Sequence, residues 1–173
     1  CKMRTKTVAV LPYDPAWKEA FERIKAPLWE RLQTWLSAVE HVGSTSVEGL
    51  WAKPIIDLDL VLKEPGFFPQ VKQELTLLGY FHEGDLGIPQ REAFAYQDKP
   101  DLMAHHLYVC PPDSLELRRH LTFRDYLRTH PAEARKYSEV KRQAAALFSH
   151  DIDGYIAQKD ACVKELYQKC SLL

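Results

Sequence analysis

Several features that would assign a protein to a specialised class are scarce in this sequence. Only four of its 173 residues are cysteine, and none of them forms a CxxC pair or a spacing typical of a zinc site. The formal net charge is −1, which excludes the strongly basic surface of a dedicated nucleic-acid-binding protein. No apolar run approaches the ~20 residues that a membrane-spanning helix needs, and no signal-peptide pattern precedes the first expected strand. Neither nucleic acid nor a membrane is therefore expected as a partner.

The few cysteines favour a reducing compartment. Cys162 and Cys170 are eight positions apart on one expected helix, which is too far for a disulfide along that helix. Reduced thiols are the simplest interpretation of such a set, and they are typical of the cytoplasm. We therefore expect a cytoplasmic protein.

The chain also has no low-complexity segment, no internal repeat and no linker rich in proline, glycine or serine. Residues 1–173 are therefore expected to form a single domain. A domain of this length can bury roughly two-thirds of its unfolded surface.

The alternation of apolar and polar residues predicts a chain of mixed secondary structure. Expected helices show apolar side chains at three- and four-residue steps, and the first of them contains Pro27, which should bend or break it. The expected strands are 6–11, 38–42, 54–62, 80–81, 91–97 and 103–110, and the expected helices are 15–37, 67–78, 115–129, 131–148 and 152–168.

The most informative stretch is a turn between two of these strands. Gly43-Ser44 opens the turn, and hydroxyl-bearing residues follow at Thr45 and Ser46. Backbone N–H groups in such a turn can face an anion. We therefore expect Gly43, Ser44, Thr45 and Ser46 to bind phosphate.

The strand after this turn carries two carboxylates in an apolar run. Asp57 and Asp59 are two positions apart, so they project from the same side of the strand while the apolar residues between them face a core. Adjacent carboxylates repel each other unless a positive charge lies near them. Mg²⁺, with Mn²⁺ as the alternative, is typically held by one or two carboxylates plus substrate phosphates. A simpler alternative is that the two carboxylates form salt bridges with Lys53 and Arg124.

Several basic residues could face the phosphate. Lys53 precedes Pro54, which holds it extended just before the acidic strand, and it is expected either to contact phosphate or to be solvated. Arg91 has a guanidinium that can bind phosphate in a bidentate manner, although an arginine at a strand edge is more often a surface residue. Lys141 and Lys159 fall on or beside apolar stripes, so their stems can pack while their ammonium groups reach a cleft.

The order of these motifs resembles the signature of the nucleotidyltransferase (polymerase beta-like) superfamily, in which a Gly-Ser pair precedes Asp-x-Asp on a strand. Twelve residues lie between Ser44 and Asp57, which suits that signature. More narrowly, GSTSVEGLWAKPIIDLDL resembles the GrpB family, also called UPF0157, in which the stretch usually reads GSTSVPGLxAKPIIDI. HHLYV at 105–109, HLTFRDYLRTHP at 120–131 and the pair Tyr137 and Lys141 agree with it, so the resemblance covers nearly the whole chain.

The resemblance implies an α+β fold with a mixed, mostly antiparallel sheet, helices on one face and a helical C-terminal part. It also implies a nucleotidyltransferase that uses a Mg²⁺-bound nucleoside triphosphate, with an acceptor that the sequence does not name. Asp57 and Asp59 would hold the metal, and His106 would assist as a ligand or a base. Phosphate charge would be screened by Lys53, Arg91 and Arg124. The helix 115–129 carries Arg124 among five basic residues, which otherwise form a solvated face.

One departure from the superfamily pattern favours a second hypothesis. The strand 103–110 carries His106 and Tyr108 on one face but no third carboxylate, and Glu48 replaces the usual proline of the family. The chain would then be a non-catalytic domain that binds a nucleotide or a coenzyme A-related molecule without turning it over. Similar domains are found fused to dephospho-CoA kinase, which suggests a link with that enzyme.

Overall fold

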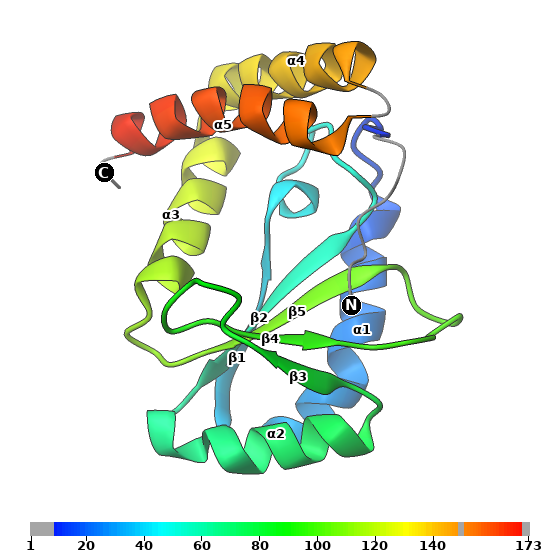
Figure 1. Cartoon of the computed structure of the whole chain (residues 1–173), viewed down its shortest axis with the longest axis vertical. Helices are drawn as coiled ribbons and strands as arrows, with labels where there is room; N and C mark the ends of the chain where they lie inside the picture. The colour runs from blue at the N-terminus through cyan, green and yellow to red at the C-terminus, as the bar shows by residue number, and fades with distance from the viewer. Residues whose placement is uncertain (1–8, 149–150, 171–173) are drawn as a thin grey trace.

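A computed structural model describes residues 9–148 and 151–170, and these residues form a five-stranded sheet and five α-helices (Figure 1). Two short 3₁₀ turns, η1 (Ser44–Ser46) and η2 (Pro65–Phe67), complete the elements. The strands are β1 (Leu36–Val42), β2 (Ile56–Leu62), β3 (Phe81–Gly84), β4 (Glu92–Ala95) and β5 (His105–Cys110). The helices are α1 (Ala16–Leu32), α2 (Phe68–Leu77), α3 (Leu115–Thr129), α4 (Pro131–Leu147) and α5 (Ile152–Lys169).

The sheet has the strand order β1-β2-β5-β4-β3. Its only parallel pair in the described chain is β2 with β5, and the other three pairs are antiparallel. The fold is therefore α+β with a mixed, mostly antiparallel sheet, as expected. The parallel pairing places Asp57 beside His106 and Asp59 beside Tyr108, so the acidic strand and the histidine strand are direct neighbours.

One face of the sheet is covered by α1 and α2 (Figure 1). Alternate residues of β2 point into this layer, where Ile56, Leu58 and Leu60 are fully buried. Ile24 and Leu28 of α1 pack in the same cluster. Burial of each such side chain stabilises the folded state by about 1.5–3 kcal/mol. This stabilisation fixes the register of β2. The carboxylates of β2 are thereby directed to the opposite face.

The C-terminal helices lie on the opposite face and beyond one end of the sheet. Leu117 of α3 packs on Val61 and Cys110. Helices α4 and α5 run side by side (Figure 1), and their apolar residues pack on Val47 and Leu50, which follow η1. This arrangement brings residues from both halves of the chain to the η1 turn.

The expected end of the first helix is wrong, and so is the expectation of a break at Pro27. The helix ends at Leu32 rather than at Ser37, because Leu36 already pairs with Leu62 as the start of β1. Pro27 does not interrupt it. Pro27 lies on the exposed side of α1, where water can satisfy the carbonyl that lacks its helical donor.

Several strand boundaries differ from those expected: β1 begins earlier, at Leu36, and β3 extends to Gly84, whereas the other three strands are shorter. β2 begins at Ile56 rather than at Pro54, β4 spans only Glu92–Ala95, and β5 begins at His105. Of the expected strand at 6–11, residues 6–8 lie outside the described chain, and Leu11 forms an isolated bridge with Ala52. In the described residues, Cys110, Cys162 and Cys170 are free thiols. Within the same residues, no helix combines the length and the apolar character required to cross a membrane.

Candidate functional site

A cavity of about 300 Å³ lies between the η1 end of the sheet and the C-terminal helices. The sheet side contributes η1, the segment before β2 and the starts of β2 and β5, while the other wall comes from α4 and α5. The polar and aromatic side chains around it are Ser44, Thr45, Lys53, Asp57, His106, Lys141, Tyr155 and Lys159. The cavity therefore combines the Gly-Ser turn, one carboxylate and three lysines.

The turn approaches the acidic strand closely because residue 43 is glycine. Gly43 adopts φ 75° and ψ −173°, a conformation that is essentially restricted to glycine. A Cβ atom at this position would overlap the Asp57 carboxylate. Gly43 therefore sets both the direction of the turn and its distance from Asp57.

Three ammonium groups converge on this cavity. Lys141 is 2% exposed, and its Nζ donates a hydrogen bond to Ser44 Oγ at 2.6 Å. Lys53 and Lys159 lie over the same ring of Tyr155, with Nζ 4.5 Å and 5.6 Å from its centroid. Cation–π contacts of this kind stabilise the ammonium groups only partly.

The pKa of each of these lysines is lowered, and burial is the main cause in all three. Burial, with a further contribution from Lys159, lowers the pKa of Lys53 to about 8. Burial together with Lys159 and Lys53 holds the pKa of Lys141 well below its usual range. Burial also lowers the pKa of Lys159. An anion in the cavity would favour the charged form of all three groups, so the arrangement is suited to bind phosphate.

Asp57 is the carboxylate that faces the cavity. Its Oδ1 accepts a hydrogen bond from His106 Nδ1 at 3.0 Å, and the two side chains are 30% and 40% exposed. This hydrogen bond raises the pKa of His106 although burial opposes it. Because both groups reach the cavity, they are available to a ligand.

Asp59 has a different environment on the same face of β2. Its side chain is fully buried, and Oδ2 accepts a hydrogen bond from His120 Nδ1 at 2.6 Å. The other nitrogen of His120 lies 3.1 Å from Glu116 Oε1. Burial would lower the pKa of His120, but the hydrogen bonds to Asp59 and Glu116 prevail and raise it to about 10. His120 is therefore an imidazolium held between two carboxylates.

The carboxylates of β2 fit a divalent cation by donor type. Asp57 and Asp59 offer the oxygen ligands that Mg²⁺ prefers. Asp59 Oδ1 is buried and has no hydrogen-bond partner among the described residues, so it has an unused acceptor position. No three His, Cys, Asp or Glu side chains within residues 9–148 and 151–170 are grouped to hold a metal. Any ion here would therefore need further ligands from water or substrate phosphate.

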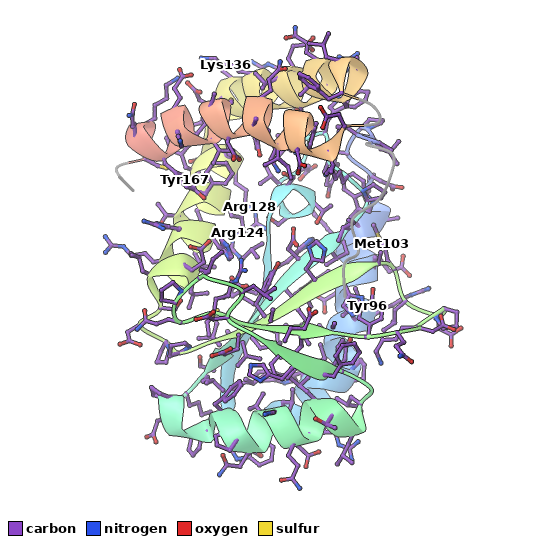
Figure 2. All side chains as sticks on the ribbon, viewed as in Figure 1. Tyr96, Met103, Arg124, Arg128, Lys136 and Tyr167 are labelled. Carbon is purple, nitrogen blue, oxygen red and sulfur yellow. The ribbon has the colours of Figure 1, made fainter. Side chains whose placement is uncertain are left out.

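The structure does not bring every expected residue to the cavity. Ser46 is buried in the turn, where its carbonyl accepts two hydrogen bonds from Arg128 at 3.0 Å and 2.7 Å. Arg124 donates to Glu40 Oε2 at 2.8 Å and to the carbonyl of His41, on the side of α3 that faces the sheet (Figure 2). Ser46 and Arg124 therefore support the η1 turn and β1, and they do not line the cavity.

Arg91 is also outside the cavity wall, because its guanidinium lies over the ring of Tyr108 at 4.2 Å from the centroid. The alternative in which Lys53 and Arg124 neutralise the two carboxylates is wrong. Asp57 and Asp59 are bonded to histidines instead.

Two residues of the site carry a signal that sequence reasoning did not use fully. Lys141 was expected beside an apolar stripe, and its ammonium does reach the cleft. His120 shares a helical face with Leu117 and Leu127, both of which are buried. A histidine at such a position is directed inward, toward the sheet.

Comparison with known proteins gives a consistent assignment. The family model described as GrpB protein matches residues 7–169. A UPF0157 protein of Pseudomonas aeruginosa is 39% identical over 166 residues, covering 92% of this chain and 66% of its own length. The chain spans 46% of the length of a Bacillus subtilis relative that is 33% identical. It therefore corresponds to part of these proteins.

Two solved structures share the fold. The crystal structure of the conserved protein GrpB from Enterococcus faecalis has a TM-score of 0.81 and 36% identity, and the match covers 94% of this chain and 96% of that one. A structure of Cid1 in complex with its short product ApU has a TM-score of 0.54 at 12% identity, covering 78% of this chain and 42% of that one. The chain therefore shares its fold with both structures. A more distant match, 25% identical, is with a dephospho-CoA kinase of Mycolicibacterium paratuberculosis, of which 46% is covered.

Proposed function

This chain belongs to the GrpB family, and from this premise and the geometry of the cavity we propose that it binds a nucleoside triphosphate and transfers the nucleotidyl group to an acceptor. The observation that carries the proposal is the convergence of Lys53, Lys141 and Lys159 on the Gly-Ser turn, next to Asp57. Three lysines face one carboxylate here, and a bound triphosphate would favour the charged form of all three.

Each part of the cavity has a role in this proposal. The turn at Ser44 and Thr45 and the three lysines would bind the β- and γ-phosphates, which orients the α-phosphate toward Asp57. Asp57 and Asp59 would hold Mg²⁺ or Mn²⁺. When bound, such an ion stabilises the negative charge that develops on the transferring phosphoryl group. We assign no phosphate contact to Ser46, Arg91 or Arg124. Ser46 is bonded to Arg128, Arg91 lies over the Tyr108 ring, and Arg124 is bonded to Glu40 on β1.

The transfer itself is a displacement at the α-phosphorus. A hydroxyl oxygen of the acceptor forms a bond to this phosphorus, and the bond between the phosphorus and the bridging oxygen of pyrophosphate breaks. Pyrophosphate leaves, and the hydroxyl proton goes to water. His106 lies beside Asp57, where it would position the acceptor hydroxyl and keep the carboxylate in its orientation.

The test is thermal unfolding with each of the four common nucleoside triphosphates, with and without Mg²⁺ or Mn²⁺. A ligand at about 100 times its dissociation constant stabilises the folded state by about 2.7 kcal/mol, which corresponds to a shift of about 5–10 °C for a chain of this size. We expect a metal-dependent shift in the native chain and its loss in Lys141→Met and Asp57→Asn. Lys136→Met is the matched control, because Lys136 lies on the same helix but is exposed and pairs with Glu165 (Figure 2). No shift with any nucleotide would contradict the proposal.

A second candidate function is nucleotide binding without transfer. It is favoured by His120, whose imidazolium already neutralises Asp59, and by β5, which carries no carboxylate beside Asp57 and Asp59. The distant relation to dephospho-CoA kinase would make a companion role near coenzyme A a natural setting. Release of pyrophosphate in the presence of acceptor alcohols supports transfer, whereas a nucleotide-dependent shift with no pyrophosphate release supports binding alone.

A further inference from the structure

The η1 turn presents three consecutive hydroxyl groups, and they differ in what they bond. Thr45 Oγ1 donates a hydrogen bond to the carbonyl of Ile55 at 3.4 Å. Ser46 Oγ donates to the carbonyl of Gly43, and Ser46 does not line the cavity between this turn and α4. Ser44 lines that cavity, and no hydrogen bond joins its hydroxyl group to a main-chain carbonyl within the described chain. Of the three, Ser44 therefore has the hydroxyl group that a ligand can reach.

Two side chains of α4 contact the Ser44 hydroxyl group. Lys141 Nζ donates a hydrogen bond to Oγ at 2.6 Å, and Tyr137, one helical turn earlier, interacts with the same hydroxyl group. Lys141 and Tyr137 are 2% and 3% exposed, and Nζ lies 4.7 Å from the centroid of the Tyr137 ring. Because both side chains are packed in the interior, they hold the Ser44 oxygen at one point of the cavity wall.

The basic side chains near Ser44 suit a phosphate ester. Lys53 and Lys159 line the same cavity as Lys141, and Asp57 is the only carboxylate among the described residues that line it. A phosphoserine carries a charge of about −1.5 to −2 at pH 7 and has three strong acceptor oxygens. A phosphate group on Ser44 would therefore face three lysines and would favour their charged form.

We propose that Ser44 is a self-phosphorylation site, whose hydroxyl group takes the γ-phosphoryl group of a nucleoside triphosphate bound in the cavity. The inference rests on the proposed function, because it needs the triphosphate to bind with its γ-phosphate at the η1 turn. No acceptor is required, so the reaction would occur when the acceptor is absent. Its product would be a modified chain and a nucleoside diphosphate.

The step is a displacement at the γ-phosphorus. Ser44 Oγ forms a bond to this phosphorus, and the bond between the phosphorus and the oxygen that bridges to the β-phosphate breaks. The nucleoside diphosphate leaves, and the hydroxyl proton goes to water. Phosphoryl transfer depends mainly on positioning and charge stabilisation. Lys141 would supply the positioning of Oγ through the hydrogen bond that it already makes.

Phosphorylation of Ser44 would regulate the same site. The phosphate group would occupy the place of the γ-phosphate and would pair with the lysines that bind the triphosphate. A second triphosphate would then meet both a steric block and negative charge. A chain that has consumed its own γ-phosphate is therefore expected to be unable to bind another nucleotide.

The first experiment incubates the chain with each of the four common nucleoside triphosphates, labelled at the γ-phosphorus, with Mg²⁺ and without an acceptor. Intact mass and peptide mapping should find a single phosphate group, on Ser44. Ser44→Ala should abolish the label, whereas Ser44→Thr keeps a hydroxyl group and should retain it at the same position. Ser37→Ala is the matched control, because Ser37 is an exposed serine on β1, and it should be labelled like the native chain.

The role of Lys141 is tested by the rate of labelling. Lys141→Met removes the hydrogen bond that positions Oγ, so labelling should slow by about tenfold or more. Lys136→Met removes an exposed lysine of the same helix and should leave the rate unchanged. Equal rates for the native chain and a folded Lys141→Met variant would contradict the proposed positioning.

A second experiment examines the modified state without any nucleotide. Ser44→Asp places a negative charge beside the three lysines, and Ser44→Asn is its neutral counterpart. The unfolding temperature of Ser44→Asp should exceed that of Ser44→Asn by about 2–4 °C. Its affinity for inorganic tripolyphosphate should be lower by about tenfold or more. Equal affinities of the two variants would contradict regulation by a phosphate group at Ser44.

The failure of this inference differs from the failure of the proposed function. A nucleotide that raises the unfolding temperature but leaves no phosphate on Ser44 would overturn self-phosphorylation alone. So would a label on another residue, or a label on Ser44 that comes from the α-phosphate, which would make Ser44 an acceptor of the nucleotidyl group instead. Neither a label nor a shift in unfolding temperature with any nucleotide would overturn both.

Discussion

The polar face of the sheet has two ends, and they differ in how their charges are balanced. Around Asp59, the His120 imidazolium lies between the carboxylates of Asp59 and Glu116, and the Asp59 side chain has no contact with water. Around Ser44, three lysines meet a single carboxylate that is already bonded to His106. The carboxylates of the two ends, Asp59 and Asp57, are both on β2 and are two positions apart.

The difference indicates what each end is for. A buried charge that the protein itself pairs, as His120 pairs with Asp59 Oδ2, helps to fix one arrangement of the chain. A cluster of like charges without enough counter-charge reduces stability and is suited to an ion from outside. The pair of His120 with Asp59 Oδ2 is therefore expected to support the fold, which leaves Asp59 Oδ1 for the proposed metal ion, and the lysine end is where the proposed phosphate would bind. The predictions below test this division.

The largest difference is expected between the two histidines that bind carboxylates. His120→Ala leaves Asp59 buried without its partner, so the free energy of unfolding should fall by about 3–5 kcal/mol. His106→Ala removes a partly exposed pair and should cost about 1 kcal/mol or less. Urea unfolding of both variants measures the difference. Equal losses would show that the two ends are not distinct in their contribution to stability.

A smaller difference is expected between two glycines with positive φ. Gly43 and Gly49 have φ values of 75° and 85°, and an alanine at either position costs about 1–3 kcal/mol in backbone strain. Only at Gly43 would the added methyl group overlap Asp57, whereas nothing lies within 4 Å at Gly49. Gly43→Ala should therefore lose about 1–3 kcal/mol more than Gly49→Ala in urea unfolding. Similar losses would mean that the turn can move away from Asp57 without cost.

The affinity for phosphate should change by about tenfold per pH unit at most. Burial lowers the pKa of Lys53 from its ordinary 10.5 to about 8. Below about pH 8 this lysine is already charged and contributes fully to anion binding. Above about pH 8, Lys53 must take up a proton when the anion binds. The affinity for the anion therefore falls as the pH rises from about 8 toward 10.5, the ordinary pKa of lysine.

Calorimetry with inorganic tripolyphosphate between about pH 7 and pH 9 measures this dependence. The ratio of the native affinity to that of Lys53→Gln cancels the titration of the ligand itself. This ratio should decrease with rising pH, and a constant ratio would exclude Lys53 from the phosphate site.

The smallest effect on stability is expected at Lys141. Replacement of a buried charge by an apolar side chain of similar length is often neutral or stabilising, so Lys141→Met should change the free energy of unfolding by about 1 kcal/mol or less and in the stabilising direction. Thermal unfolding without ligand measures it, with Lys136→Met as the exposed control. A loss of stability would show that Lys141 supports the fold, as His120 does, and would weaken the contrast between the two ends.

Local patterns in the sequence were sufficient for much of the fold and for the centre of the site. Alternation along β2 predicted that Asp57 and Asp59 share a face, and the register confirms it. The Gly-Ser turn was expected to precede the acidic strand, with twelve residues between Ser44 and Asp57. These features depend on residues that are close in sequence, so strand geometry is enough to place them.

The misplaced residues depend on contacts between distant segments. Arg124 was expected near phosphate, but Glu40 on β1 lies within its reach and binds it. Arg91 was a candidate clamp, but the ring of Tyr108 provides a closer partner. The pairing of His120 with Asp59 joins residues 61 positions apart. Helical periodicity shows which face His120 occupies, but it does not show which strand that face will meet.

The hydrogen bond between Lys141 and Ser44 spans 97 positions of the chain. Closing a loop of this length costs conformational entropy before the contact can repay it. The cavity between the η1 turn and the helices α4 and α5 is therefore expected to form late in folding, after the sheet and α1 have assembled from nearer contacts. If phosphate binds here as proposed, recovery of binding during refolding would report that α4 has reached the η1 turn.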